Sequence, residues 1–281
     1  MHLNFAFTAH QILWTLAFAA QLVLLVVLSG RERSRLFPWF TASIFLSTLH
    51  LLVEELLTGR MPVFKLQWIL IPMSDLSALL GILVVVEIAR RSFPGARGKA
   101  WLIAAPLLTL LAGLSLTYWG PWPARADLVV NSPISLLRLL FFFGEKVNIL
   151  ASLLIVGLGL LVLFFGRCFN TGWRKHSSLI LIGLVAIALT WLCILAYWKN
   201  LSLTILPNMT REQYQLAQGH IQEIGKKLFD GNRIVGIVVA LWWVVSLWID
   251  EPGIAASGNA TEAELLPEIS AVSASESPTE E

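Results

Sequence analysis

The chain has 281 residues, of which 57% are hydrophobic and only 14% are charged, and its formal net charge is +2. A soluble domain carries about 25% charged residues. This composition excludes an ordinary soluble domain and favours long uncharged segments in a hydrocarbon solvent. The charges are also unevenly placed, because no basic residue follows Arg233 and the segment after Asp250 is acidic.

Seven apolar segments follow one another along the chain, and each approaches the ~20 residues that a helix needs to cross ~30 Å of hydrocarbon. A single lipid-exposed segment satisfies its own backbone hydrogen bonds only as a helix. The sequence therefore predicts an all-α polytopic membrane protein. Its seven transmembrane helices are expected at residues 9–29, 38–58, 64–89, 100–119, 140–166, 177–198 and 233–249.

Basic residues gather in the first, third and fifth loops between these segments, whereas the second and fourth loops hold few. Short loops rich in Lys and Arg stay in the cytoplasm. We therefore predict a multi-pass protein of the bacterial inner (plasma) membrane, with its N-terminus outside and its C-terminus in the cytoplasm. The basic residues of the three odd loops are Arg31, Arg33, Arg35, Arg90, Arg91, Arg97, Lys99, Arg167, Arg174 and Lys175.

Two segments outside the spans have patterns of their own. Residues 211–229 predict an amphipathic helix in the outer loop, ended by Gly231, which lies on the outer membrane surface or caps the bundle. The tail, residues 252–281, is rich in Ser, Ala and Glu, so we expect a disordered acidic segment after a membrane domain of residues 1–251. The apolar face of the outer-loop helix consists of Tyr214, Ala217, Ile221, Ile224 and Leu228.

Ionisable residues within the spans are the default functional candidates in a membrane protein. At ~1.5 Å of rise per residue, four of them lie roughly 18–25 Å from the cytoplasmic side, and a further pair lies slightly higher. One interpretation is an outward-facing polar pocket for a small polar ligand, a proton or a cation. The other is a set of ion pairs between helices and side chains that reach the interface. The candidate ligand-binding residues are Asp75, His50, Glu54, Arg233, Glu145 and Lys146.

Asp75 is the leading single candidate, because it follows Pro72 within an apolar span. Proline removes a backbone hydrogen bond and can kink a helix beside the acid. We expect Asp75 to face the bundle interior. An isolated buried charge is costly, so its carboxyl is expected to be protonated or held by a cation such as Arg233 or Lys146.

Glu87, and the pair of His50 and Glu54, give weaker evidence of a functional site. Glu87 precedes Arg90 and Arg91 by three and four residues, so an ion pair on the helix surface is sufficient to explain it. His50 and Glu54 share one helix face and are acceptable metal ligands, but the chain shows no zinc-like or di-iron spacing. We predict no metal and no cofactor.

Four short segments, in their order along the chain, resemble a family of bacterial seven-helix membrane proteins without an established activity. The resemblance implies a seven-helix membrane domain to about Pro252 and assigns no functional residue. The family tends to have tyrosines in its last span, where this chain has Trp242 and Trp243. The segments are Phe37–Ala42 (FPWFTA), Glu87–Arg91 (EIARR), Glu145–Lys146 and Gly172–Arg174 (GWR).

These observations leave three functions open. The preferred one is a non-enzymatic sensor or small-ligand-binding module that passes a signal to a cytoplasmic or membrane protein partner, a layout similar to the seven-helix sensor modules before bacterial kinases. A small transporter or proton-coupled permease is the first alternative, and a lipid-acting membrane enzyme is the second. A retinal protein is excluded because the last span has no lysine. The expected surroundings are the lipid bilayer, and no nucleic acid is expected as a partner.

Overall fold

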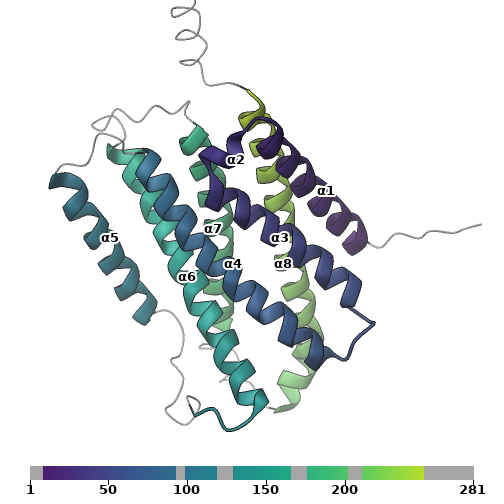
Figure 1. The fold of residues 1–281 in the computed structure, drawn as a ribbon. Coiled ribbons are helices and arrows are strands. Elements are labelled where there is room, and N and C mark those ends of the chain that lie inside the picture. Colours follow the sequence, from purple (N-terminus) through teal and green to yellow (C-terminus); the bar gives the residue numbers. More distant parts are fainter. Residues whose placement is uncertain (1–8, 93–98, 119–128, 166–175, 202–210, 250–281) are drawn as a thin grey trace, which may run out of the picture.

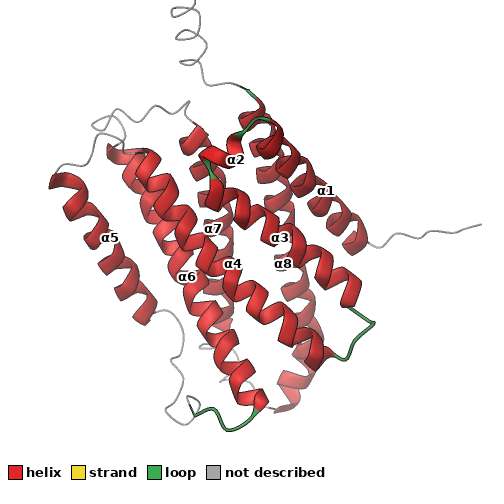
Figure 2. Ribbon diagram, in the orientation of Figure 1, coloured by secondary structure: helices red, strands yellow, loops and turns green. Residues whose placement is uncertain are grey.

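The computed structural model describes residues 9–92, 99–118, 129–165, 176–201 and 211–249. Every regular element in these residues is a helix (Figure 2). The expected tail, Cys168 and most of the fourth and fifth loops lie outside the described residues. The helices are α1 (Ala9–Gly30), α2 (Arg33–Leu36), α3 (Pro38–Leu57), α4 (Val63–Ser92), α5 (Lys99–Tyr118), α6 (Pro133–Phe165), α7 (His176–Asn200) and α8 (Arg211–Trp248).

Six of the long helices form a closed ring. Each packs against its neighbours in the order α1, α3, α4, α6, α7, α8 and back to α1, while α5 lies outside the ring against α6 (Figure 1). These six are the helices in the described residues that are long and apolar enough to cross a membrane. For α5, the described apolar stretch is the shorter segment Leu108–Thr117. The structure is therefore that of a multi-pass membrane protein with six candidate spans.

The surface of the ring is apolar, as a hydrocarbon solvent requires. Large side chains are widely exposed on it, including Val26 at 69%, Phe164 at 71% and Val245 at 59%. A soluble protein of this size rarely exposes such a continuous apolar surface. The exposed faces of the helices are therefore their lipid-facing sides.

The predicted separation of an outer-loop helix from the last span is wrong. Helix α8 runs without a break from Arg211 to Trp248 and passes through Gly231, the predicted stop. Its first half packs along α7, because a Cβ atom at Gly225 would lie 3.0 Å from the Trp198 ring and the ring of Phe229 lies 6.3 Å from that of Trp191. Because α7 covers this part of α8, the apolar face of α8 does not have to be buried against the membrane surface.

One half of the ring is filled by a compact apolar core. This half lies at the end of the bundle that carries α2, which we name the α2 end. The core side chains come from the last turns of α1, α4, α6 and α8 and the first turns of α3 and α7. The largest fully buried side chain is that of Phe40, whose ring meets the ring of Trp243 edge to face at 4.9 Å. This end of the bundle is tightly closed.

Glu87 fixes the start of α3 at the α2 end. Its side chain is buried, and its carboxylate accepts hydrogen bonds from the backbone N–H groups of Phe40 at 3.0 Å and Trp39 at 3.4 Å. The first N–H groups of a helix lack partners within that helix, and a negative charge is favourable there. The predicted surface pair with Arg90 and Arg91 is therefore wrong as the explanation of Glu87, which caps a helix 47 residues earlier in the chain.

Replacing Glu87 by alanine is expected to lower the thermal stability of the purified protein markedly. Loss of the carboxylate leaves the buried Phe40 N–H unsatisfied, which costs about 1–3 kcal/mol, and also removes the acceptor of the partly buried Trp39 N–H. The measurement is the melting temperature in detergent. Glu32→Ala is the matched control, since Glu32 pairs with Arg35 on the exposed surface and its loss is expected to cost less than about 0.5 kcal/mol. Equal effects of the two substitutions would contradict the cap.

Candidate functional site

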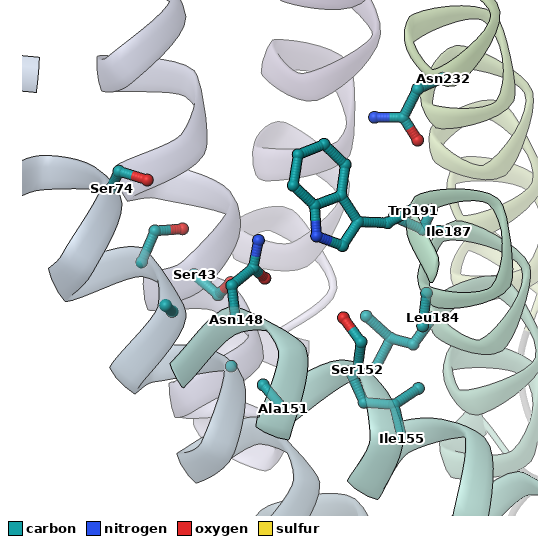
Figure 3. Close-up of a pocket in the computed structure, with 14 residues that line it drawn as sticks. Ser43, Ser74, Asn148, Ala151, Ser152, Ile155, Leu184, Ile187, Trp191 and Asn232 are labelled. Carbon is teal, nitrogen blue, oxygen red and sulfur yellow. The ribbon is translucent and has the colours of Figure 1, made fainter. Parts of the chain in front are cut away.

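A polar cavity of about 350 Å³ lies inside the ring, between α3, α4, α6, α7 and α8 (Figure 3). It adjoins the apolar core on the side away from the α2 end. Its polar lining consists of neutral side chains, which is the kind of surface that hydrogen-bonds a small molecule without a large desolvation cost. These side chains are Ser43, Ser74, Ser77, Asn148, Ser152, Trp191 and Asn232.

Small residues on α4 and α6 create the space. The α4 lining residues recur at helical spacing from Ser74 to Gly81, and those of α6 recur in the same way from Asn148 to Ile155, so each set forms one helix face. At the seam the helices come close: a Cβ atom at Gly81 would lie 3.5 Å from that of Ala151. Small side chains let the backbones approach while leaving room beside the seam.

The cavity holds unpaired hydrogen-bonding atoms. Trp191 Nε1 and Asn232 Oδ1 are buried, and neither has a hydrogen-bond partner among the residues that the structure describes. Figure 3 shows the Trp191 ring and the Asn148 amide extending into the cavity from different helices, with the Asn232 carboxamide reaching toward Trp191 from α8. Buried polar atoms of this kind are usually satisfied by ordered water or by a ligand.

Asp75 faces the interior, as predicted, but it is not among the described residues that line the cavity. It follows Ser74 in α4, is 8% exposed, and its carboxyl packs so closely on α6 that a Cβ atom at Gly144 would overlap it. Gly144 precedes the lining residue Asn148 by one helical turn. The Asp75 Oδ2 atom is buried without a hydrogen-bond partner in the described part of the chain.

The other predicted site residues do not converge on Asp75. Glu54 and Arg233 form an ion pair between α3 and α8, with 3.8 Å between Oε2 and Nη2, and His50 is half-buried one turn before Glu54. This pair fits the ion-pair interpretation of the ionisable residues. Arg233 is therefore engaged by a different acid, and the expected pairing of Arg233 with Asp75 is not found.

Glu145 and Lys146 diverge from each other. The side chain of Glu145 is exposed, whereas Lys146 is buried with its ammonium 5.2 Å from the centre of the Phe142 ring. No ion pair between Lys146 and Asp75 occurs among the described residues. None of the six predicted residues is among the described residues that line the central cavity, although Asp75 and Arg233 each follow a lining residue, Ser74 and Asn232.

Sequence reasoning missed the neutral lining residues. The predicted site consisted of charged groups within the spans, although Ser74 and Ser77, and likewise Asn148 and Ser152, already share a helix face by their spacing. Two small polar residues on one face in each of the third and fifth predicted spans would have indicated where a polar cavity forms. The distinction between a lining face and a packed face still depends on which helices are neighbours.

Comparisons with protein-family models, with curated proteins and with solved structures give no match to this chain. The resemblance of its short segments to a seven-helix family therefore stays a prediction. Two of those segments nevertheless meet in space. Glu87 binds the backbone of Trp39 and Phe40, and the Arg91 guanidinium lies 4.8 Å from the centre of the Phe37 ring. They form one structural unit at the α2 end.

Adding a methyl group at Gly144 is expected to destabilise the protein, because it would displace the Asp75 carboxyl or separate α4 from α6. Overpacking of this kind typically costs about 1–3 kcal/mol. Gly236→Ala in α8 is the matched control, since nothing lies within 4 Å of its added Cβ and alanine favours a helix. Thermal melting of both variants checks the contact, and a Gly144→Ala variant as stable as Gly236→Ala would refute it.

Proposed function

We propose that this chain is a seven-span inner-membrane protein that binds a small polar ligand in its central cavity and acts as a sensor or ligand-binding module. The observation that carries the proposal is the contrast between the two halves of the ring. An apolar core closes the α2 end, whereas unpaired polar atoms line the cavity beyond it. A ligand that satisfies those atoms would reach them from the side opposite the α2 end.

The seventh span of this proposal is α5. At ~1.5 Å per residue its 20 residues reach about 30 Å, which is enough to cross the hydrocarbon core. It packs on α6, and a Cβ atom at Gly157 of α6 would overlap the Leu108 side chain. With seven spans the two chain ends lie on opposite sides of the membrane.

The proposed orientation places the α2 end in the cytoplasm. Exposed basic residues gather there, including Arg31, Arg35, Arg90 and Arg91. Loops that carry such residues stay on the cytoplasmic side. The cavity then receives its ligand from outside the cell, and the tightly packed half of the bundle faces the cytoplasmic partner.

Binding is favoured over catalysis by the chemistry of the lining. The described lining residues offer serine hydroxyls and asparagine amides, but none of them is an acid, a histidine or a lysine that would activate a serine nucleophile. Hydrogen bonding to a small molecule is what this set of groups does well. A transporter remains the alternative, and Pro72 in α4 beside Asp75 is the feature that favours it, because a proline weakens a helix where it would have to bend.

A reporter fused to the C-terminus tests the orientation. Alkaline phosphatase fused after residue 281 is expected to be inactive, and a fluorescent protein that folds only in the cytoplasm is expected to be active. The same pair of reporters fused within residues 120–128 should give the reverse result. An active phosphatase at the C-terminus would overturn the orientation and the span count together.

Cysteine modification tests access to the cavity. In a chain whose Cys168 and Cys193 are replaced by serine, Ser77→Cys is expected to react with a charged, membrane-impermeant methanethiosulfonate added outside the cell. Leu79→Cys is the matched control on the same helix, because Leu79 is 42% exposed on the lipid-facing side and a charged reagent does not enter hydrocarbon.

The side from which Ser77→Cys reacts separates the functions. Reaction from the outside alone supports an outward-facing binding module. Equal reaction from both sides supports a transporter that alternates its access. A Ser77→Cys residue that resists the reagent from both sides, as Leu79→Cys does, would refute the ligand-binding cavity.

A further inference from the structure

The central cavity has two unlike walls. Helices α3 and α4 contribute serine hydroxyls to it, including those of Ser74 and Ser77. Helix α7 contributes aliphatic side chains, including Leu184 and Ile187, and the ring of Trp191. Figure 3 shows Ser74 on one side of the cavity and Leu184 and Ile187 on the other. A molecule that fits between such walls has one polar edge that forms hydrogen bonds and one apolar face.

The described lining of the cavity carries no charge, because it contains no acid, histidine, lysine or arginine. Arg233 follows the lining residue Asn232 but is paired with Glu54. The Asp75 carboxyl packs on α6 at Gly144 instead of lining the cavity. An ion in the cavity would lose its water without meeting an opposite charge, which costs far more than burying a neutral polar group. The ligand that fits this lining is therefore uncharged.

Two buried groups on different helices determine which hydrogen bonds the ligand must form. Within the described residues, the indole N–H of Trp191 in α7 has no acceptor, and the Oδ1 atom of Asn232 in α8 has no donor. An indole N–H only donates, whereas a carboxamide oxygen only accepts. A ligand that satisfies both groups must accept one hydrogen bond and donate another. An amide group can do both, because it carries a carbonyl oxygen and N–H hydrogens.

We propose that the ligand of the central cavity is a small uncharged amide. Its apolar body lies against the Trp191 ring and the aliphatic side chains of α7, and its amide group forms hydrogen bonds with the polar lining. This inference rests on the proposed ligand-binding function and names its ligand class. The cavity volume of about 350 Å³ is near the lower end of ligand pockets, which are about 300–1,000 Å³, so the amide is a small one. A planar body is favoured, because aromatic rings stack on an indole.

Benzamide, benzoate and benzamidinium test the proposal, because they share a planar shape and are neutral, negative and positive. Binding of each to the purified full-length protein is measured at neutral pH by titration calorimetry and by protection of Ser77→Cys from the thiol reagent. Benzamide is expected to bind at least about tenfold more tightly than either charged molecule. Trp191→Leu should weaken the binding of benzamide at least about tenfold, since it removes both the ring and its N–H.

A charge placed in the lining tests the same selectivity in reverse. Ser77→Asp introduces a carboxylate into the cavity and should change the preference from benzamide to benzamidinium. Asn131→Asp is the matched control, because it adds the same charge at an exposed position before α6 and should leave the preference unchanged. A melting curve shows whether each variant is folded. Should Ser77→Asp fail to fold, the ranking by the wild-type protein and the effect of Trp191→Leu decide the matter.

The outcomes separate this inference from the function on which it rests. If a charged molecule binds as tightly as benzamide, or if folded Trp191→Leu binds benzamide as the wild-type protein does, the amide proposal is overturned. If Ser77→Cys reacts but none of the three molecules binds or protects it, the cavity holds water only, and the ligand class is wrong although the cavity is accessible. A Ser77→Cys residue that resists the reagent from both sides refutes the ligand-binding function itself.

Discussion

The close approach of α4 and α6 is the contact on which the rest of the structure depends. Hydrocarbon provides no partners for polar groups, so a carboxyl such as that of Asp75 must lie inside the ring. It fits there because residue 144 is a glycine and leaves room on α6 for the acid. The same seam continues through Gly81 and Ala151, where small side chains leave the polar cavity beside it. Packing and site are thus built by the same residues.

The interior of the ring is filled differently in its two halves. At the α2 end, Phe40 and Trp243 fill the interior, and Glu87 satisfies the first turn of α3. Toward the other end, neutral polar side chains replace the apolar core and leave space between them. A tightly packed half next to one with a polar cavity is a suitable arrangement for a binding module, because Ser43 in the cavity lies only one turn beyond the buried Phe40.

The positions of the helices could be predicted from the sequence because hydrocarbon imposes length and composition on each span. The start of α3 at Pro38 agrees with the prediction, whereas α6 begins at Pro133 instead of residue 140 and α8 continues through Gly231. Gly231 does not end α8, because α7 packs beside this part of α8 and stabilises the continuous helix. Interior facing could be predicted for Asp75, but not the partners of Glu87 or Arg233, because the sequence does not show which helices are neighbours.

An engineered disulfide across the α4–α6 seam tests the central claim most directly. In a background without Cys168 and Cys193, Gly81→Cys and Ala151→Cys place their Cβ atoms at about the 3.5 Å that the structure gives, within the range of about 3.5–4.5 Å that disulfides adopt. The account predicts rapid cross-linking on mild oxidation in membranes, seen as a band shift after proteolysis between the two helices. The absence of a cross-link in a folded double variant, or equal cross-linking of Gly113→Cys with Ala151→Cys, would contradict it.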